Sequence, residues 1–184
     1  MTLSALKTSI EGVRLLEPTI YRDERGFFYE SFNEKSFCDS VEGNFTFVQD
    51  NHSKSTRHVL RGLHYQIKQP QGKLVRVIKG SIYDVAVDLR QTSISFGEHV
   101  VVELSAQNNR QIWIPEGCAH GFLVTSDTAE VIYKTTDYYA PEYERCLRWN
   151  DPSLDIDWPL EGIMPVLSKK DAEGALFTNT ELFS

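Results

Sequence analysis

The segment Pro115-Glu116-Gly117-Cys118-Ala119-His120-Gly121-Phe122 joins a tight turn to the start of a predicted β-strand. Proline and glycine two residues apart are typical of a turn. The residues that follow, 121–125, have the short apolar pattern of a buried strand. The turn therefore delivers His120 to the beginning of a strand.

A second histidine lies in the strand-like run Val59-Leu60-Arg61-Gly62-Leu63-His64-Tyr65-Gln66. Side chains on a strand alternate between faces, so residues two apart share a face and residues three apart do not. We expect His64 to share a face with Leu60 and Gly62, and Arg61 to lie on the other face. An imidazole on an inward face is costly without partners, and Gly62 leaves room for another group to approach the backbone. Taken alone, His64 is interpreted as a core histidine with a hydrogen bond.

Similar short strands recur along the chain, separated by turn signals such as Gln71-Gly72 and Lys79-Gly80. The predicted strands are 26–32, 44–49, 59–66, 73–79, 81–89, 99–105, 110–114, 121–125 and 130–136. Short strands at regular spacing favour a sandwich or jelly roll over a sheet built from βαβ units. Helical signals are few: one short helix is predicted to start at 33–37, and Ser168-Lys169-Lys170-Asp171 has the spacing of a capping box. The sequence predicts one all-β jelly-roll domain, 1–184, with a few short peripheral helices.

The composition is that of an ordinary globular protein, with 184 residues, 41% of them hydrophobic and 24% charged. The net charge of −7 argues against general binding to nucleic acid, which needs a basic face. Three cysteines, Cys38, Cys118 and Cys146, form no CxxC pair, so neither a zinc site nor a disulfide framework is predicted. The sequence shows no secretory signal and no stretch long enough to span a membrane, so we expect a cytoplasmic protein.

The spacing P-x-G-x-x-H at 115–120 resembles the second signature of the cupin barrels, which are jelly rolls. Metal-binding cupins carry an H-x-H pair in their first signature, and the matching segment here, His64-Tyr65-Gln66, lacks the second histidine. Val124 stands where another ligand would follow His120. Metal centres usually need three or more protein ligands. The resemblance therefore implies a cupin-like double-stranded β-helix, and no metal is expected.

A set of motifs in chain order gives a closer resemblance. The segments are Asp23-Glu24-Arg25-Gly26-Phe27-Phe28, Phe47-Val48-Gln49-Asp50-Asn51-His52-Ser53, Leu60-Arg61-Gly62-Leu63-His64, Gln71-Gly72-Lys73-Leu74-Val75-Arg76, Asp84-Val85-Ala86-Val87-Asp88, Trp113-Ile114-Pro115-Glu116-Gly117, Ala119-His120-Gly121-Phe122 and Leu167-Ser168-Lys169-Lys170-Asp171. From about residue 5 to residue 172, the chain resembles the dTDP-4-dehydrorhamnose 3,5-epimerase family. The resemblance implies a homodimeric enzyme without a cofactor that makes the L-configured precursor of dTDP-L-rhamnose.

The implied chemistry is proton transfer beside a ketone. Carbons 3 and 5 of a 4-keto sugar flank the carbonyl, and their protons are weakly acidic because the carbanion delocalises into an enolate. Inversion needs a base on one face, an acid on the other, and positive charge near the oxyanion. The resemblance implies His64 as the base, Tyr133 as the acid and Asp171 as the carboxylate that pairs with the histidine. Residue types alone favour a core aromatic for Tyr133, and Asp171 could equally serve as a helix-capping acid or in both roles.

A nucleotide diphosphate is strongly anionic and the protein is acidic, so local cations must reverse the average field at the site. The resemblance implies that Arg61 and Lys73 lie near the sugar and its enolate or phosphates. It also implies that Tyr139 stacks on the thymine ring and that His120 contacts the substrate. The other implied substrate-binding residues are Arg25, Glu30, Gln49, Asn51, Glu144 and Lys170.

Three other functions stay open at this point. One is a metal-dependent cupin enzyme with His64 and His120 as ligands. Another is a non-catalytic module that binds sugar nucleotides, although the presence of His64, Tyr133 and Asp171 together argues against it. The third is a relative that epimerises carbon 3 only or moves the keto group. The implied homodimer has one physical support, because aromatic alternating strands such as 27–32 are suited to complete a partner's sheet edge.

Overall fold

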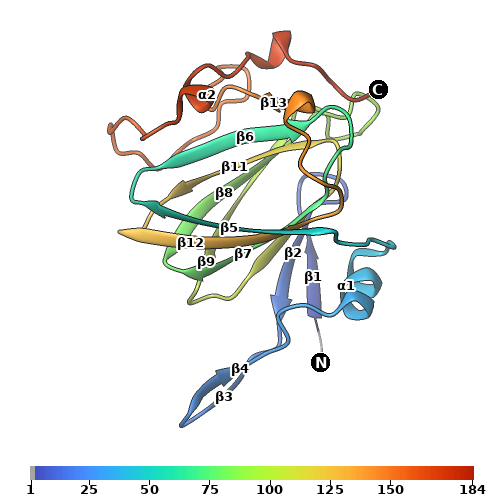
Figure 1. Cartoon of the computed structure of the whole chain (residues 1–184), viewed down its shortest axis with the longest axis vertical. Helices are drawn as coiled ribbons and strands as arrows, with labels where there is room; N and C mark the ends of the chain where they lie inside the picture. Colours follow the sequence, from blue (N-terminus) through green and yellow to red (C-terminus); the bar gives the residue numbers. More distant parts are fainter. Residues whose placement is uncertain (1–2) are drawn as a thin grey trace.

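The computed structural model describes residues 3–184, which form two antiparallel sheets packed face to face (Figure 1). Across the first sheet the six strands are β1 (Leu3–Lys7), β2 (Arg14–Pro18), β10 (Gln111–Ile114), β7 (Lys73–Lys79), β12 (Thr128–Thr135) and β5 (Gln49–Thr56). Across the second the five strands are β13 (Glu144–Cys146), β6 (Leu60–Gln66), β11 (Cys118–Val124), β8 (Ser81–Asp88) and β9 (His99–Ser105). The chain alternates between the two sheets, as in a jelly roll. The predicted all-β jelly roll is confirmed.

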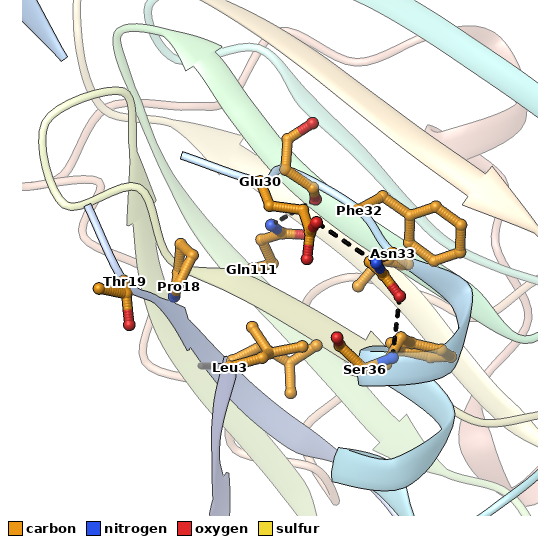
Figure 2. A pocket seen from close by; sticks show the side chains of 12 residues that line it. Leu3, Pro18, Thr19, Glu30, Phe32, Asn33, Ser36 and Gln111 are labelled. Carbon is orange, nitrogen blue, oxygen red and sulfur yellow. Dashed lines mark hydrogen bonds between the residues drawn. The ribbon is translucent and has the colours of Figure 1, made fainter. Parts of the chain in front are cut away.

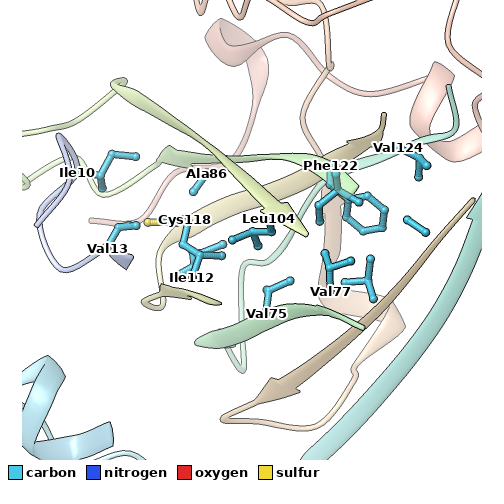
Figure 3. Close-up of a cluster of buried hydrophobic side chains, with 14 residues drawn as sticks. Ile10, Val13, Val75, Val77, Ala86, Leu104, Ile112, Cys118, Phe122 and Val124 are labelled. Carbon is cyan, nitrogen blue, oxygen red and sulfur yellow. The ribbon is translucent and has the colours of Figure 1, made fainter. Parts of the chain in front are cut away.

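The main core lies between the two sheets. Val75 and Ile112 of the six-stranded sheet meet Leu104 and Phe122 of the five-stranded sheet in one buried cluster (Figure 3). Burying an aliphatic or aromatic side chain of this size stabilises the fold by about 1.5–3 kcal/mol. This layer therefore holds the sheets together and leaves their edges to carry polar groups.

Short helices and loops cover the outer faces of the sandwich. On the six-stranded sheet, Phe37 of helix α1 (Glu34–Val41) packs on Trp113 with ring centroids 5.2 Å apart. On the five-stranded sheet, the segment after β13 adds Leu154 and Trp158 to a buried cluster that includes Leu63. That segment contains helix α2 (Lys169–Ala172) and the 3-10 helix η2 (Phe177–Asn179), and η1 (Pro141–Tyr143) precedes β13. The predicted short peripheral helices are confirmed, and no helix among residues 3–184 is long and apolar enough to cross a membrane.

Two aromatic segments differ from their prediction as strands. Only 26–28 of the predicted strand 26–32 pairs, as β4 (Gly26–Phe28) of a hairpin with β3 (Tyr21–Asp23). Residues 44–48 form no strand. Phe45 and Phe47 instead both pack on Trp113, with ring centroids 4.6 and 6.0 Å away. Their alternation reflects a packed loop and not a pleated strand.

Strand β6 carries an irregularity that corrects the expected placement of Arg61. His64 lies opposite His120 and Arg61 lies opposite Phe122, so β6 has one residue more than β11 over this interval. The bulge lies at Gly62, whose φ of +114° favours glycine. A Cβ on Gly62 would lie 2.6 Å from the carbonyl oxygen of His120, which explains why no larger residue fits. The extra residue inverts the alternation of side chains between faces.

As a result, Arg61 and His64 line the same cavity, although they are three residues apart. Leu60 and Leu63 pack together on the opposite face of the sheet, in the cluster beneath the C-terminal segment. The prediction that Leu60 shares a face with His64, and that Arg61 does not, was wrong because strict alternation takes no account of a bulge.

Candidate active site

A cavity of about 390 Å³ opens between the two sheets, a size typical of a site for a small organic ligand. Its walls come from β5, β7 and β12 on one sheet and from β6, β11 and β13 on the other. The lining residues are Gln49, Asn51, Ser53, Arg61, His64, Tyr65, Gln66, Gln71, Lys73, His120, Gly121, Phe122, Tyr133, Tyr139, Glu144, Ser168, Lys170 and Asp171. Eleven of the thirteen residues predicted from the sequence are therefore brought together in one cavity.

His64 and Asp171 form a close pair in this cavity. The Nε2 atom of His64 lies 2.6 Å from Oδ1 of Asp171. The backbone N–H of Gly62 donates to the same oxygen at 3.3 Å, and the Ser168 hydroxyl donates to the other oxygen at 2.6 Å. Ser168 is also the N-cap of α2, because its hydroxyl accepts from the Asp171 backbone N–H at 3.2 Å. The predicted capping residue thus helps to hold the carboxylate against β6.

The protonation states of the pair follow from its surroundings. Burial lowers the pKa of His64 below its ordinary 6.5, more than the hydrogen bond to Asp171 raises it. Burial alone would raise the pKa of Asp171, but hydrogen bonds from His64 and Ser168 outweigh it and lower the pKa to about 2. At neutral pH the imidazole is neutral and the carboxylate ionised. Nε2–H therefore donates to Asp171, and the lone pair on Nδ1 is the basic one.

Lys73 brings a buried cation to the same cavity. Its side chain is buried, and Nζ donates to the backbone carbonyl of His64 at 3.1 Å. Burial lowers the pKa of Lys73 to about 8. Arg61 lies on the same wall as His64, and its Nε donates to the Ser55 hydroxyl at 2.9 Å. Two cationic side chains, Lys73 and Arg61, therefore line the cavity.

Tyr133 reaches the cavity from the opposite sheet. It lies on β12, paired with Asn51 of β5 on one side and Val75 of β7 on the other. Burial raises the pKa of the phenol above its ordinary value of 10, so the hydroxyl carries its proton at neutral pH. A protonated phenol on one sheet and a neutral imidazole on the other therefore line the same cavity.

A second histidine–aspartate pair lies deeper in the five-stranded sheet. Nε2 of His120 is 2.9 Å from Oδ2 of Asp84 on the neighbouring strand β8. Asp84 is fully buried, and its other oxygen has no hydrogen-bond partner among residues 3–184. The sequence did not single out Asp84 as a site residue. The sequence feature that could have identified it is a carboxylate directly before the apolar run Val85-Ala86-Val87 of a predicted buried strand.

Polar side chains at one end of the cavity form a connected network. Glu144 accepts a hydrogen bond from Lys170 at 2.7 Å and another from the Tyr139 hydroxyl at 2.9 Å. Burial alone would raise the pKa of Glu144, but these two bonds lower it below its ordinary value. The side chain of Gln49 accepts from the Tyr139 backbone N–H and donates to Asn51, both at 3.0 Å. These residues are held in place before any ligand arrives.

A sequence model of the dTDP-4-dehydrorhamnose 3,5-epimerase family matches residues 7–179. The chain belongs to this family. It is 55% identical over 181 residues to the dTDP-4-dehydrorhamnose 3,5-epimerase of Pseudomonas aeruginosa, a match that covers 98% of this chain and 99% of the relative. The resemblance inferred from the motifs is confirmed, and the chain is an enzyme of the epimerase class.

Solved structures of epimerases superpose closely on the chain. The dTDP-6-deoxy-D-glucose-3,5-epimerase of Legionella pneumophila, in complex with dTDP-4-keto-L-rhamnose, has a TM-score of 0.94 and 51% identity, covering 97% of this chain and 95% of the other. A 3′-monoepimerase from Streptomyces bikiniensis in complex with dTDP-quinovose has a TM-score of 0.87 and 35% identity, covering 93% and 86%. The family fold thus serves enzymes that are named for inverting two centres and for inverting one.

Two of the residues implied by the family resemblance lie outside the cavity. Arg25 is on the β3–β4 hairpin, which projects from the body of the molecule (Figure 1), and is ion-paired with Asp23 at 2.6 Å. Glu30 lines a separate pocket of about 20 Å³, where Asn33 donates to it at 3.3 Å (Figure 2). That pocket has room for about one water molecule. Within one chain, Arg25 and Glu30 therefore lie apart from the other eleven residues, and their expected part in substrate binding stays a prediction.

One group of potential metal ligands lies in the described part of the epimerase chain. The ligand atoms of His64, Cys146 and Asp171 all lie within 4.8 Å of one another. His120 is not part of this group, so the alternative of a cupin metal site built on His64 and His120 gains no third ligand from it. Cys146 had no role in the sequence-based prediction. The one sequence feature that pointed to the site was its position two residues after the predicted site residue Glu144; in the structure both residues lie on β13, which pairs with β6.

Proposed function

We propose that this cavity inverts carbons 3 and 5 of dTDP-4-dehydro-6-deoxy-D-glucose, giving dTDP-4-dehydro-L-rhamnose. The observation that carries the proposal is the placement of a neutral, carboxylate-paired His64 and a protonated Tyr133 on opposite walls of one cavity. Base and acid on opposite faces of a substrate are the arrangement that inversion of a carbon centre requires.

In the proposed first step, the Nδ1 lone pair of His64 removes the proton from a carbon next to the ketone. The electron pair of the C–H bond moves into an enolate, whose negative charge develops on O4. Asp171 stabilises the imidazolium that forms. Tyr133 then delivers its hydroxyl proton to the opposite face of the same carbon. The His64 imidazolium releases its extra proton to solvent, and the Tyr133 phenolate takes one up, which restores the starting protonation states. The same two steps at the second carbon complete the reaction, which consumes no redox cofactor.

Lys73 and Arg61 supply the positive charge for the enolate in this proposal. Lys73 is buried beside the His64 backbone, where a cation is screened less than at the surface. Removing one such preorganised donor typically costs about 10²- to 10³-fold in rate. His120, on the strand beside β6, is proposed to hydrogen-bond the sugar.

The network around Glu144 is proposed to bind the nucleotide. Tyr139 is half exposed, and its hydroxyl bond to Glu144 orients the ring, so one face is suited to stack on thymine. Lys170 is proposed to meet the diphosphate, while Gln49 and Asn51 offer amide donors from β5. The substrate is therefore proposed to lie with its base at this network and its sugar between the two walls.

The decisive experiment is incubation with dTDP-4-dehydro-6-deoxy-D-glucose in D2O, followed by NMR at carbons 3 and 5. Deuterium at both carbons, with inversion at both, supports the proposal. Deuterium at carbon 3 alone would make this chain a 3-epimerase, the activity named for the Streptomyces bikiniensis structure. No exchange at either carbon by folded enzyme would refute the proposed function.

We further propose that the enzyme is a homodimer in which the hairpin of each chain serves the partner's cavity. The hairpin pairs only within its own two strands, and it exposes Tyr21, Phe27 and Phe28 by 52%, 57% and 62%. Exposed aromatic side chains on a projecting hairpin are suited to bury themselves against a second chain. Arg25 at the tip would then meet the anionic nucleotide from outside.

Mixing two inactive variants tests this arrangement. Arg25→Ala and His64→Ala homodimers are each expected to be weakly active or inactive. After exchange of subunits, a heterodimer contains one cavity with an intact His64 and an intact Arg25 from the partner. Recovery of activity on mixing supports action between subunits, whereas no recovery, or a monomer in sedimentation, would contradict it.

A cytoplasmic location is also proposed, because Cys38, Cys118 and Cys146 are all free thiols.

A further inference from the structure

Cys146 lies beside the proposed catalytic pair, yet the reaction makes no use of it. Its Sγ atom, a ring nitrogen of His64 and an oxygen of Asp171 lie within 4.8 Å of one another. Cys146 is on β13, directly opposite His64 in the pairing with β6. The backbone ladder therefore holds the Cα atom of Cys146 at a fixed place beside His64.

The three donor atoms have the chemistry of a zinc site. Zn²⁺ binds cysteine sulfur, histidine nitrogen and carboxylate oxygen in a tetrahedron, at about 2.0–2.3 Å, and three protein ligands leave a fourth position for water. Ligand atoms at the corners of such a tetrahedron lie roughly 3.3–3.8 Å apart. To bind the cation, the 2.6 Å separation of His64 and Asp171 must lengthen, and the sulfur, now within 4.8 Å of both ligand atoms, must approach.

We propose that His64, Cys146 and Asp171 form a binding site for a thiophilic divalent cation of the Zn²⁺ or Cd²⁺ type, and that this cation inhibits the enzyme. Inhibition rests on the proposed function of His64 as the base. The cation would bind Nε2, the nitrogen that now faces Asp171. The imidazole proton then moves to Nδ1, and no basic lone pair is left to attack the substrate.

Protons and charges balance in this step. The Cys146 thiol releases its proton to solvent as the sulfur–metal bond forms, and the Asp171 oxygen exchanges its hydrogen bond from Nε2 for a bond to the metal. One thiolate and one carboxylate neutralise the two charges of the cation, which suits a partly buried site. Burial raises the pKa of Cys146 to about 12, so the thiol keeps its proton until a metal displaces it.

The charges around the site allow a cation to bind, and its donor atoms favour a soft cation over a hard one. Lys170 opposes a cation, but its Nζ is paired with Glu144 at 2.7 Å. Mg²⁺ and Ca²⁺ prefer oxygen ligands, whereas two of the three donor atoms in this group are nitrogen and sulfur. Zn²⁺ and Cd²⁺ are therefore expected to bind where Mg²⁺ and Ca²⁺ do not.

Binding is tested first without substrate, so that the substrate diphosphate takes up no metal. Cd²⁺ is titrated into the wild-type enzyme and into Cys146→Ser, and the ultraviolet cadmium–thiolate absorption is recorded. Cys38→Ser is the matched control, because Cys38 lies in α1 and its sulfur contacts the Phe45 carbonyl. The band should appear in wild type and Cys38→Ser and be absent in Cys146→Ser. A band of equal size in Cys146→Ser would overturn the proposed site.

Inhibition is tested next at fixed free Zn²⁺ concentrations, with activity restored by a chelator. Losing even an outer partner of a metal site typically costs about 10- to 100-fold in affinity, so losing a ligand should raise the half-inhibiting Zn²⁺ concentration of Cys146→Ser at least tenfold. Equal inhibition of wild type and Cys146→Ser would refute the inference and leave the proposed function intact. A wild-type enzyme that is inactive without metal would instead refute the proposed function. Cys146→Ala replaces the serine variant if the latter does not fold.

Discussion

Two histidine–aspartate pairs stand on neighbouring strands of the same sheet, and they are built differently. His64 on β6 pairs with Asp171 from α2, whereas His120 on β11 pairs with Asp84 on the adjacent β8. Both oxygens of Asp171 accept hydrogen bonds, while one oxygen of Asp84 has no partner in the described chain. The side chain of His64 is 25% exposed and that of His120 is 8% exposed.

In the proposed mechanism, pairing with a carboxylate does not by itself make a histidine the base. A base must reach a substrate proton, so the more exposed His64 is suited to the role, and its carboxylate is fully satisfied and fixed. The pair within the sheet is suited to hold an imidazole in one orientation. Burial lowers the pKa of Lys73, and the charge of Asp84 partly raises it again, so this pair acts on the charge of the cavity.

The largest expected effect separates the two histidines. His64→Asn should lower kcat/KM by about 10³-fold or more, and it should abolish deuterium exchange at both carbons, because no other base reaches the proton. His120→Asn should cost about tenfold, the loss of one hydrogen bond. Initial rates by NMR measure both. Near-normal turnover in His64→Asn, or equal losses in the two variants, would break the distinction drawn between the pairs.

Tyr133→Phe should separate the two halves of the inversion. The ring and its packing stay, so the melting temperature should hold, while formation of the inverted sugar should fall by about 10²-fold or more. His64 still removes a proton and returns a deuteron to the same face, so exchange from D2O should continue. If His120 or Tyr139 delivered the proton instead, Tyr133→Phe would form product at the wild-type rate. In that case Tyr133 would not be the acid.

The two carboxylates should differ by a smaller factor. Asp171→Asn should lower kcat by about 10²-fold, because the imidazole survives with a poorer orientation. Asp84→Asn should lower it by about tenfold or less, since it acts through His120. A purely structural role for Asp171 would instead appear as a lower melting temperature with little change in kcat per folded molecule. Thermal unfolding of both variants is therefore measured alongside the rates.

The smallest effects concern the pH profile. The rate kcat/KM should rise with pH as His64 loses its proton, at a pKa below 6.5, and fall as Lys73 loses its charge near pH 8. Asp171 raises the pKa of His64, so Asp171→Asn should move the acid limb to lower pH. Asp84 raises the pKa of Lys73, so Asp84→Asn should move the alkaline limb to lower pH. If Asp171→Asn moved the alkaline limb, or Asp84→Asn moved the acid limb, the two histidine–aspartate pairs would not act independently on the pH profile.

The strands of the core could be predicted from the sequence because their apolar pattern is local. The expected strands 73–79 and 99–105 match β7 and β9. Strand β5 was not predicted, since Gln49–Thr56 is polar throughout, with one face turned to the cavity and an edge position in its sheet. Its strand character comes from pairing with β12, which no local pattern reveals.

The residues of the site were predicted by resemblance, and their partners were not. The shared face of Arg61 and His64 depends on a bulge that only the register with β11 reveals. Asp84 and Cys146 acquire their neighbours through strand pairing between distant segments. Arg25 lies in a sequence motif of the family, but in the fold of one chain it lies away from the cavity. Sequence motifs identify residue types, whereas contacts between distant segments need the structure.

The span between His64 and its carboxylate has a consequence for the order in which the enzyme is made. The two residues are 107 positions apart, and the ribosome produces β6 long before α2. At about 5–20 residues per second, translation of this interval takes roughly 5–20 s. During that time the nascent chain carries an imidazole whose orienting carboxylate has not yet been synthesised. Translation that stops short of α2 therefore yields a product that has most of the sandwich strands but little activity.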